Sequence, residues 1–526
     1  MASNPASPVI PLPKATPAVN PSLLALSAIC LGLSLNVREG LFNNWAILLL
    51  TLALAWCILA VFPFSCGRRF GLRTPPTKSI LIAGIALQLL ALFFSPPGTV
   101  LNARWLGDRP DVAPLSERGW QKTGESPEHA NAELRHKRAL ARASGTGFAN
   151  RLLAVAVVAM IAGVLFRKPS VVLAIAIVGF LVLGVFVLRV SPNPYIDVHV
   201  FQQESCKALL AGQNPYAIRF PNIYGPDAFV YGQGLKAAEY VNFGYPYPPI
   251  TLFMALPGYL IAGDHRYSQL VAFALAALLI ALLRPGIVAT LAAVLLLFSP
   301  RSFMLIELAW TEPFVILLLA LTIFCAVRFP RAMPYALGLL LAGKQYLVFA
   351  VPLVALLVNE TGRAFWRQYA IILAKAFTVA ILVSAPLVLW DLPAFIHSAV
   401  TLQLHQPFRN DALSYLAWLW WLLNKTLPDR FGLTFAASLG EWPQRLSGAA
   451  FVAAIAAIVA ALRRCPRCPG GFAAAIAVTF YAFLVVNKQA FCNYYFLVLA
   501  ALCCAIALLA LPVEMDRSEG DQKSDC

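Results

Sequence analysis

VVLAIAIVGFLVLGVFVLRV, residues 171–190, is a stretch of twenty residues whose only charge is Arg189. An α-helix needs about twenty apolar residues to cross the hydrocarbon core of a bilayer, so this stretch predicts a membrane-spanning helix. Comparable apolar runs recur along the chain and are separated by short polar segments. These other runs are 23–37, 46–64, 79–94, 152–166, 250–262, 270–283, 287–298, 314–327, 332–358, 371–390, 446–462, 472–486 and 494–511.

The composition agrees with this pattern. Hydrophobic residues make up 60% of the 526 residues and charged residues only 12%, which is far more apolar than a water-soluble domain can bury. Several runs are short for an upright span. We therefore expect an all-α, polytopic integral membrane protein with roughly 11–14 transmembrane or partly crossing helices.

The net charge of +16 reflects basic clusters in the loops between the apolar runs, so nucleic-acid binding is not expected. Lys and Arg favour cytoplasmic loops, which places the segments 191–249, 391–424 and 487–493 on the extracytoplasmic side. If every apolar run crosses the membrane, successive loops should lie on alternating sides. Between Ile250 and Pro313 this rule gives one crossing too many or too few, and Arg284 and Arg301 indicate different sides. The basic clusters are Arg68, Arg69, Arg73 and Lys78; Arg167 and Lys168; Arg328 and Arg331; Arg363 and Arg367; and Arg463, Arg464 and Arg467.

The expected organisation has five parts. Residues 1–20 and 513–526 are polar and predict disordered tails. Residues 21–190 hold the N-terminal membrane helices and a polar loop at 95–151. Residues 191–249 are rich in Tyr and Pro and predict an ordered extracytoplasmic loop of the kind that builds an active site. Residues 250–512 hold the C-terminal membrane helices, with outward loops at 391–424 and 487–493.

The eleven cysteines are scattered and predict no disulfide framework. Cys465 and Cys468 form a CPRC pair in a basic loop, but a single pair without a second pair or a nearby His is weak support for zinc. The outward loops show no metal-ligand spacing. Neither a metal nor a cofactor is predicted.

Asp197 is the most informative polar residue, because it follows an apolar span within a few residues, in the stretch SPNPYIDVHV. A carboxylate at the membrane boundary can stay ionised and still reach a substrate held at the lipid interface. It could act as a general base that deprotonates a sugar hydroxyl. The competing interpretation is that Asp197 only caps a helix.

Two further motifs follow Asp197 within the same loop. These are GQNPY, ending at Tyr216, and FGYPYPP, which contains Tyr247 and leads into the next apolar run. By themselves they are turn signals and interfacial aromatic residues. In this order and spacing they resemble the polyprenol-phosphate-sugar-dependent membrane glycosyltransferases of GT-C architecture, in particular glycosyltransferase family 87, the mycobacterial α-mannosyltransferase-like group.

The resemblance extends over roughly residues 190–511. The stretch GKQY around Lys344 resembles the lysine that interrupts a helix pair in that family, although Gln345 stands where proline is more usual. QLHQPFRND, residues 403–411, resembles a later outward loop, and NKQAFCNYY, residues 487–495, resembles the last outward motif before the final span.

The resemblance implies a GT-C-type helical bundle in the inner (plasma) membrane of a cell envelope. It implies transfer of mannose or another hexose or pentose from a polyprenyl-phosphate donor to a lipid or glycan acceptor on the extracytoplasmic face, with inversion. Asp197 would be the base, assisted by His405, and Lys344, Arg409 and Lys488 would hold the phosphate. The other implied substrate-binding residues are Tyr216, Tyr247, Gln345, Gln406 and Asn493.

Two other hypotheses remain open. A secondary transporter of a small solute or a lipid-linked substrate shares broken helices and charged groups at mid-depth, but no internal repeat relates the two halves of this chain. The other alternative is a scaffold subunit without catalytic activity. His199 and His397 lie on the same expected side as His405, and we interpret both as ordinary polar loop residues.

Overall fold

The computed structural model describes residues 19–62, 75–94, 168–225, 230–232, 234–426 and 446–510, with single positions between 151 and 164. In this part of the chain the regular structure is helical, and β-pairing is limited to two isolated bridges, Pro221 with Tyr240 and Lys236 with Val241. Residues 95–150 of the expected polar loop at 95–151, almost all of both tails and most of the apolar run 152–166 lie outside the described residues.

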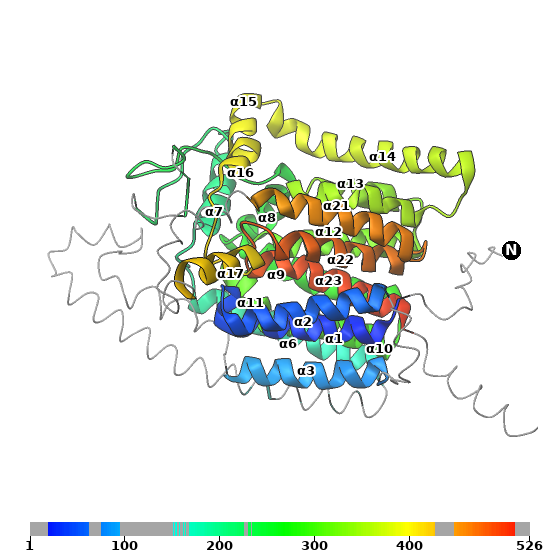
Figure 1. Ribbon diagram of the computed structural model, residues 1–526. Helices are drawn as coiled ribbons and strands as arrows, with labels where there is room; N and C mark the ends of the chain where they lie inside the picture. Colours follow the sequence, from blue (N-terminus) through cyan, green and yellow to red (C-terminus); the bar gives the residue numbers. More distant parts are fainter. Residues whose placement is uncertain are drawn as a thin grey trace, which may run out of the picture.

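The apolar runs form a bundle of roughly parallel and antiparallel helices (Figure 1). Seven helical segments in the described ranges are long and apolar enough to cross a membrane, which makes the protein a membrane-embedded helical protein. They are α1 with its continuation (Pro21–Gly40), α2 (Asn44–Val61), α3 (Thr77–Phe94), α6 (Pro169–Val190), α9 (Arg266–Leu283), α14 (Gly362–Val388) and α23 (Cys492–Leu509). Shorter helices of the bundle are α8 (Pro249–Ala262), α10 (Ile287–Leu297), α12 (Glu312–Arg328), α13 (Met333–Leu341), α21 (Ala449–Arg464) and α22 (Pro469–Val485).

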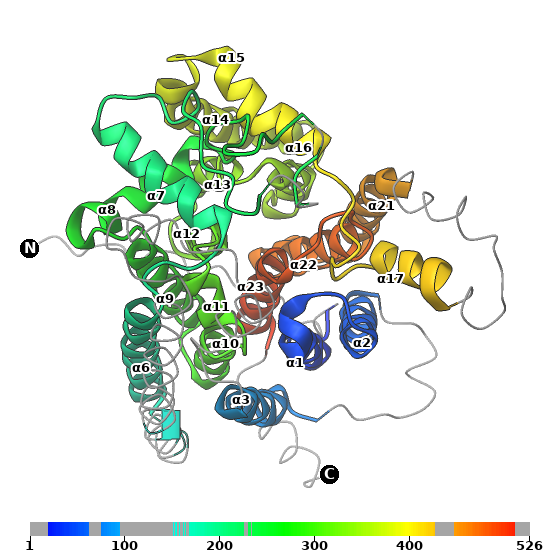
Figure 2. The same ribbon diagram turned by 90° about the vertical axis from the view of Figure 1, so that its left-hand side faces the viewer.

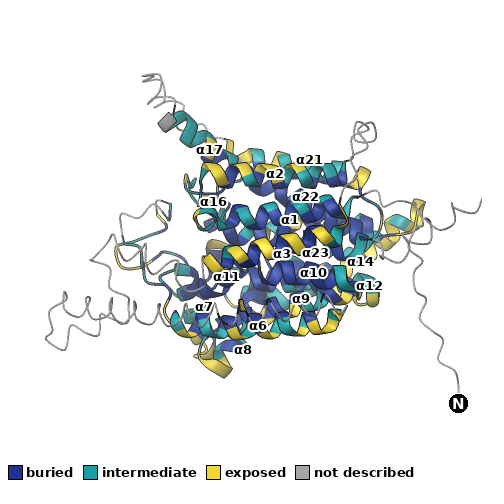
Figure 3. Ribbon diagram, turned by 90° about the horizontal axis from the view of Figure 1, so that it is seen from below, coloured by how far each residue is buried: buried dark blue, intermediate teal, exposed yellow. Residues whose placement is uncertain are grey.

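Burial separates central from peripheral helices. The last helix, α23, lies at the centre, and 83% of the residues in its apolar span are buried, whereas α14 lies at the edge and only 17% of its span is buried (Figures 2 and 3). Large apolar side chains on α14 such as Trp366, Ile381 and Leu382 are exposed, as expected for a surface that faces lipid. The N-terminal helices are not a separate domain, because α1 packs on α23 and α6 packs on α9 and α10.

The structure explains why the loops between Ile250 and Pro313 do not alternate between the two sides of the membrane: the helix α8 does not cross from one end of the bundle to the other. Tyr247, just before α8, lines the same cavity as Asp197, and Gly263, just after α8, accepts a hydrogen bond from Gln203 of the helix α7 (Asp197–Leu210). Both ends of α8 therefore lie at the end of the bundle where α7 lies (Figure 2).

When α8 is not counted as a membrane crossing, Arg284 and Arg301 are expected at opposite ends of the bundle, and the structure places them there. Arg284 donates to the carbonyl of Ala510 after α23, whereas Arg301 donates to the carbonyl of Asn36 at the end of α1. These two helix ends are opposite, since α1 and α23 run antiparallel (Figure 1).

The expected single apolar run 332–358 is broken. It forms α13, an extended residue at Lys344 and two short 3₁₀ helices, Gln345–Ala350 and Pro352–Leu357. A lysine is costly inside a continuous apolar helix, so the backbone opens where this side chain enters the bundle.

The segments expected as loops carry much helix. The outward segment 391–424 contains α15 (Leu392–Phe395), a π-helical turn (Ile396–Thr401), α16 (Leu402–His405) and α17 (Tyr415–Trp421). The segment 191–249 begins with α7. A second apolar cluster unites these parts with α8, and its aromatic members are Phe201, Tyr216, Phe220, Tyr231, Phe243, Tyr245 and Phe314.

Candidate active site

The start of α7 is held in place by the chain before it and by a buried arginine. Pro192 and Pro194 follow the last residue of α6 and prevent the helix from continuing. Arg266 is fully buried at the start of α9 and donates to the carbonyls of Ser191 and Pro192. The next helix then begins at Asp197, whose carboxylate lies at the positive end of the helix dipole.

Asp197 accepts hydrogen bonds on both carboxylate oxygens. Tyr231 donates its hydroxyl to Oδ2 at 2.7 Å, and Oδ1 accepts from the backbone N–H of Val198 at 2.8 Å and from Tyr224 at 3.3 Å. The N-cap position of α7 is Ile196 and Asp197 is the first helical residue, so its side chain does not cap the helix; it lines a cavity. A carboxylate has about four acceptor positions, so three donors leave room for a substrate hydroxyl.

Burial raises the pKa of Asp197 above its ordinary value, and the hydrogen bonds from Tyr231, Val198 and Tyr224 oppose that rise. The charge of Arg409 also lowers the pKa, although its effect is the weakest of these. The raised pKa is a property expected of a general base, because a more basic carboxylate accepts a proton more readily.

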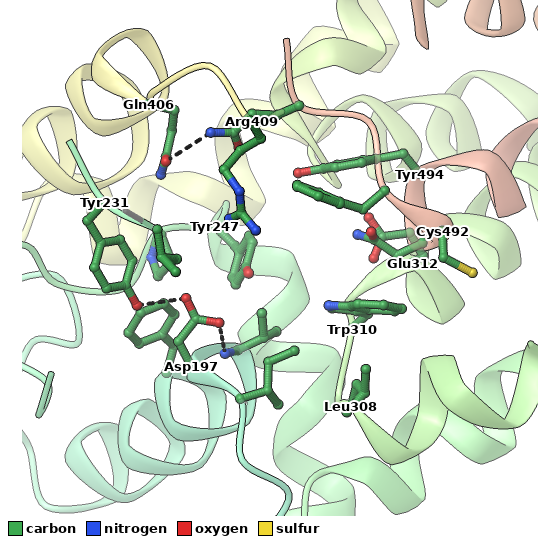
Figure 4. A pocket seen from close by; sticks show the side chains of 18 of the residues that line it. Asp197, Tyr231, Tyr247, Leu308, Trp310, Glu312, Gln406, Arg409, Cys492 and Tyr494 are labelled. Carbon is green, nitrogen blue, oxygen red and sulfur yellow. Dashed lines mark hydrogen bonds between the residues drawn. The ribbon is translucent and has the colours of Figure 1, made fainter. Parts of the chain in front are cut away.

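The cavity beside Asp197 has a volume of about 240 Å³. Figure 4 shows Asp197 on one side of it, Glu312 and Tyr494 on the other, and Arg409 entering between them. The lining comes mainly from α7, the loop before α8, the segments around α11 (Ser302–Glu307) and α12, the loop after α16 and the loop that leads into α23. Its polar and aromatic members are Glu39, Asp197, Phe201, Tyr224, Tyr231, Phe243, Tyr247, Trp310, Glu312, Lys344, Gln403, Gln406, Arg409, Asp411, Gln489, Phe491, Asn493 and Tyr494.

Lys344 lies deep in the cavity wall and is paired with a carboxylate. Its Nζ donates to Oε1 of Glu312 at 3.0 Å, and the exposed fractions of the two side chains are 6% and 0%. The same ammonium group lies 4.8 Å from the ring centroid of Tyr247 and 5.4 Å from that of Tyr494. Lys344 is thus surrounded by one opposite charge and two aromatic faces.

Arg409 also has an acidic partner. It donates through Nε and Nη2 to both oxygens of Asp411, each at 2.8 Å, and its guanidinium stacks over Phe491 at 4.8 Å. Its backbone N–H donates to the carbonyl of Lys488 at 3.1 Å. This ladder joins the loop after α16 to the loop before α23.

Lys488 holds this junction from the other side. Its Nζ donates to the carbonyl of Gln406 at 2.7 Å, and Gln489 donates to the carbonyl of Pro407 at 2.9 Å. Burial lowers the pKa of Lys488. The lysine is therefore placed to position the loop that carries Gln406 and Arg409.

Six of the ten residues predicted from the sequence line the cavity: Asp197, Tyr247, Lys344, Gln406, Arg409 and Asn493. The other four lie outside it. Lys488 contacts the loop carbonyls, Gln345 donates to the carbonyl of Ala399, and Tyr216 donates to the carbonyl of Tyr247. His405 is exposed and donates through Nδ1 to the carbonyl of Thr401, so the structure does not bring it beside Asp197.

The sequence reasoning missed several lining residues. Glu312 begins an apolar helix, and a carboxylate at such depth was a usable signal. Tyr231 and Trp310 had no signal beyond their aromatic character. Glu39 lies in a turn where Arg38 and Glu39 have φ angles of 47° and 64°, a backbone conformation that non-glycine residues rarely adopt.

Charges in the lining are unequal. Four carboxylates, those of Glu39, Asp197, Glu312 and Asp411, face two cations, Lys344 and Arg409, among the described residues. An anionic substrate must therefore be held by individual donors and not by a general positive potential.

No protein-family model, curated protein or solved structure matches the chain. The cavity and its residues are therefore the basis on which a function is argued.

Proposed function

We propose that this protein is a membrane glycosyltransferase that moves a sugar, mannose or another hexose or pentose, from a polyprenyl-phosphate carrier to a lipid or glycan acceptor. The observation that carries this proposal is the position of Asp197. It is a half-buried carboxylate with a raised pKa at the start of a helix, and it lines a cavity in an apolar bundle.

The reaction is a single displacement. The acceptor hydroxyl oxygen attacks the anomeric carbon while Asp197 takes its proton. The bond between the anomeric carbon and the phosphate oxygen breaks, and polyprenyl phosphate leaves with the electron pair. Attack on the side opposite to the leaving group inverts the anomeric centre.

The phosphate requires donors that stabilise the leaving oxygen. Arg409 donates two N–H groups to Asp411, and Lys344 donates one to Glu312. Both cations line the cavity, so a phosphate there would share them with their carboxylates. The amides of Gln406 and Asn493 add neutral donors.

The aromatic residues suit a sugar ring. Tyr247, Trp310 and Tyr494 line the cavity and offer flat apolar faces next to polar groups (Figure 4). A pyranose has both apolar C–H faces and hydroxyl groups, so this wall is complementary to it.

Basic residues at the far end of the bundle support an extracytoplasmic position for the cavity. Arg328 donates to the carbonyl of Leu282 at the end of α9, and Arg467 stacks over Phe365 at the start of α14. Because Lys and Arg favour cytoplasmic loops, the opposite end with Asp197 faces the extracytoplasmic side. Donors of this class carry their sugar at a membrane face, which agrees with a cavity at that end.

A second candidate is a secondary transporter, and the buried pair of Glu312 and Lys344 favours it. The pair lies where a helix is interrupted, as binding sites of transporters often do. Transport and transfer differ in covalent chemistry, since a transporter releases its substrate unchanged.

The test uses the full chain in proteoliposomes with a panel of radiolabelled short-chain polyprenyl-phosphate sugars and an acceptor extract from the host membranes. Transfer of label from the donor to a new product, with release of polyprenyl phosphate, supports the enzyme. Uptake of an unmodified solute driven by an ion gradient, with no sugar transfer from any donor, would overturn the glycosyltransferase proposal in favour of a transporter.

A further inference from the structure

Two histidines and an aspartate meet on the side of α7 that faces away from the cavity. A ring nitrogen of His199, a ring nitrogen of His265 and a carboxylate oxygen of Asp264 all lie within 4.8 Å of one another. His199 follows Asp197 by two residues, which corresponds to about 200° around a helix. None of the three residues lines the cavity beside Asp197.

The tautomer of His265 follows from its neighbour. Its Nδ1 lies 2.8 Å from Oε1 of Gln203, and an amide oxygen only accepts, so Nδ1 carries the hydrogen. Gln203 is oriented in turn by its own donation to the carbonyl of Gly263 at 2.7 Å. The lone pair of His265 therefore lies on Nε2.

Two ring nitrogens in this cluster have no hydrogen-bond partner within the described part of the chain. They are Nε2 of His265, whose residue is fully buried, and Nδ1 of His199, whose residue is 8% exposed. A buried polar atom without a partner is costly, so native proteins usually satisfy such atoms with protein, water or an ion.

The protonation states suit a cation. Burial lowers the pKa of His199 to about 4 and that of His265 well below its ordinary value, so both rings are neutral at pH 7. Burial alone would raise the pKa of Asp264, but the hydrogen bonds and charge of Arg266 outweigh it and lower the pKa. Neutral imidazoles and an ionised carboxylate are the forms that bind a metal.

We propose that His199, Asp264 and His265 bind one divalent transition-metal ion of the zinc type, with a water as the fourth ligand. Two imidazoles and one carboxylate are a donor set that zinc prefers. In a tetrahedral site, ligand atoms at 2.0–2.2 Å from zinc lie roughly 3.3–3.6 Å apart, so the three groups close in slightly around the ion.

The surroundings supply the second layer of contacts that metal ligands need. His265 donates through its other nitrogen to Gln203, and Asp264 is held by Arg266 through Nε and Nη2. Oδ1 of Asp264 accepts from the backbone N–H and the Nε–H of Arg266, and Oδ2 accepts from the same Nε–H and from Nη2. Because the Nε–H is shared between the two oxygens, coordination by one oxygen leaves this donor bonded to the other.

The ion would fasten α7 to the turn between α8 and α9. Arg266 already ties the same turn to the end of α6 through the carbonyls of Ser191 and Pro192. The metal is thus a structural brace behind Asp197 and not a participant in sugar transfer. This inference is independent of the proposed function.

The test measures metal in the purified full-length protein in detergent. After exposure to excess Zn²⁺ and removal of free ion, the wild type should hold about one zinc per chain by elemental analysis. His199→Asn and His265→Gln should each lose most of it, whereas His397→Gln should keep it, because His397 instead hydrogen-bonds to the carbonyl of Asn242. Zinc content that is absent from the wild type, or unchanged in the double variant His199→Asn/His265→Gln, would overturn the proposal.

A second measurement does not depend on the folding of a variant. Addition of Co²⁺ to metal-free wild type should produce the visible absorption bands of a tetrahedral cobalt site, and Zn²⁺ should abolish them by displacement. Zn²⁺ should also raise the unfolding temperature of the metal-free wild type. A flat spectrum together with an unchanged unfolding temperature would contradict the site.

Discussion

Tyr231 donates its hydroxyl to Oδ2 of Asp197 over 2.7 Å, and this bond joins the aromatic loop before α8 to the first turn of α7. Tyr231 is itself buried and packs on Phe243, so the phenol cannot swing away without disturbing the apolar cluster. The carboxylate is consequently held in one orientation toward the cavity. In the proposed reaction Tyr231 is a positioning residue that also tunes the base.

Tyr231→Phe should shift the pH dependence of sugar transfer. The base works only when it is ionised, so activity falls as the pH drops through the pKa of Asp197. Burial has already raised this pKa, and the Tyr231 hydrogen bond lowers it, so loss of the bond raises it further. The acid limb of the kcat/KM profile should therefore move to higher pH.

Tyr240→Phe is the matched control for that profile. Tyr240 belongs to the same loop but is exposed and does not line the cavity. Its acid limb should coincide with that of the wild type. An acid limb that is the same in Tyr231→Phe and the wild type would show that Asp197 does not control the rate through this bond.

Lys344→Met should destabilise the protein strongly. The substitution leaves the fully buried carboxylate of Glu312 without its cation, and breaking a buried ion pair from one side costs about 3–5 kcal/mol. Adding Glu312→Gln should recover much of that loss. Thermal unfolding in detergent measures both variants.

Lys207→Met serves as the comparison for Lys344→Met. Lys207 pairs with Glu204 at 3.8 Å on an exposed surface, where such pairs contribute about 0–1 kcal/mol. Equal destabilisation by the two substitutions would contradict a buried pair at Lys344.

Gly244→Ala should lower both stability and transfer activity, although Gly244 does not line the cavity. A Cβ at this position would overlap the carbonyl oxygen of Tyr216, which is rigid backbone. Forced overpacking costs about 1–3 kcal/mol, and here the strain falls on the loop that carries Tyr247. Lower unfolding temperature and lower transfer are expected, whereas Gly448→Ala, which has open space around it, should change neither.

His405→Gln should leave transfer within about twofold of the wild type, as for most surface substitutions. The ring does not line the cavity, and Nδ1 donates to the carbonyl of Thr401. A partner in proton transfer would instead lose about a hundredfold or more. A loss of that size would restore His405 to the role that the sequence resemblance implied.

The helix positions could be predicted closely because bilayer thickness acts on each run separately. The run 171–190 became Pro169–Val190, and the run 494–511 became Cys492–Leu509. The interruption at Lys344 was visible only as one charge in a long run, and the position of α8 at one end of the bundle had no local signal.

The site could be predicted only where a residue carries its signal locally. Asp197 was identifiable because it follows a span directly. Its partner Tyr231 and the opposing Glu312 reach the cavity through tertiary packing, which sequence spacing does not encode. The same holds for His199 and His265, which lie on different elements and meet only in the folded chain.

Replacement of Asp197 by Asn tests the central claim most directly, because the amide keeps the shape of the side chain and removes its basicity. With the radiolabelled polyprenyl-phosphate sugar that the wild type uses, kcat should fall by about a hundredfold to ten-thousandfold. Asp391→Asn, which affects a helix cap outside the cavity, should retain wild-type kcat. Wild-type turnover by a folded Asp197→Asn protein would contradict the account.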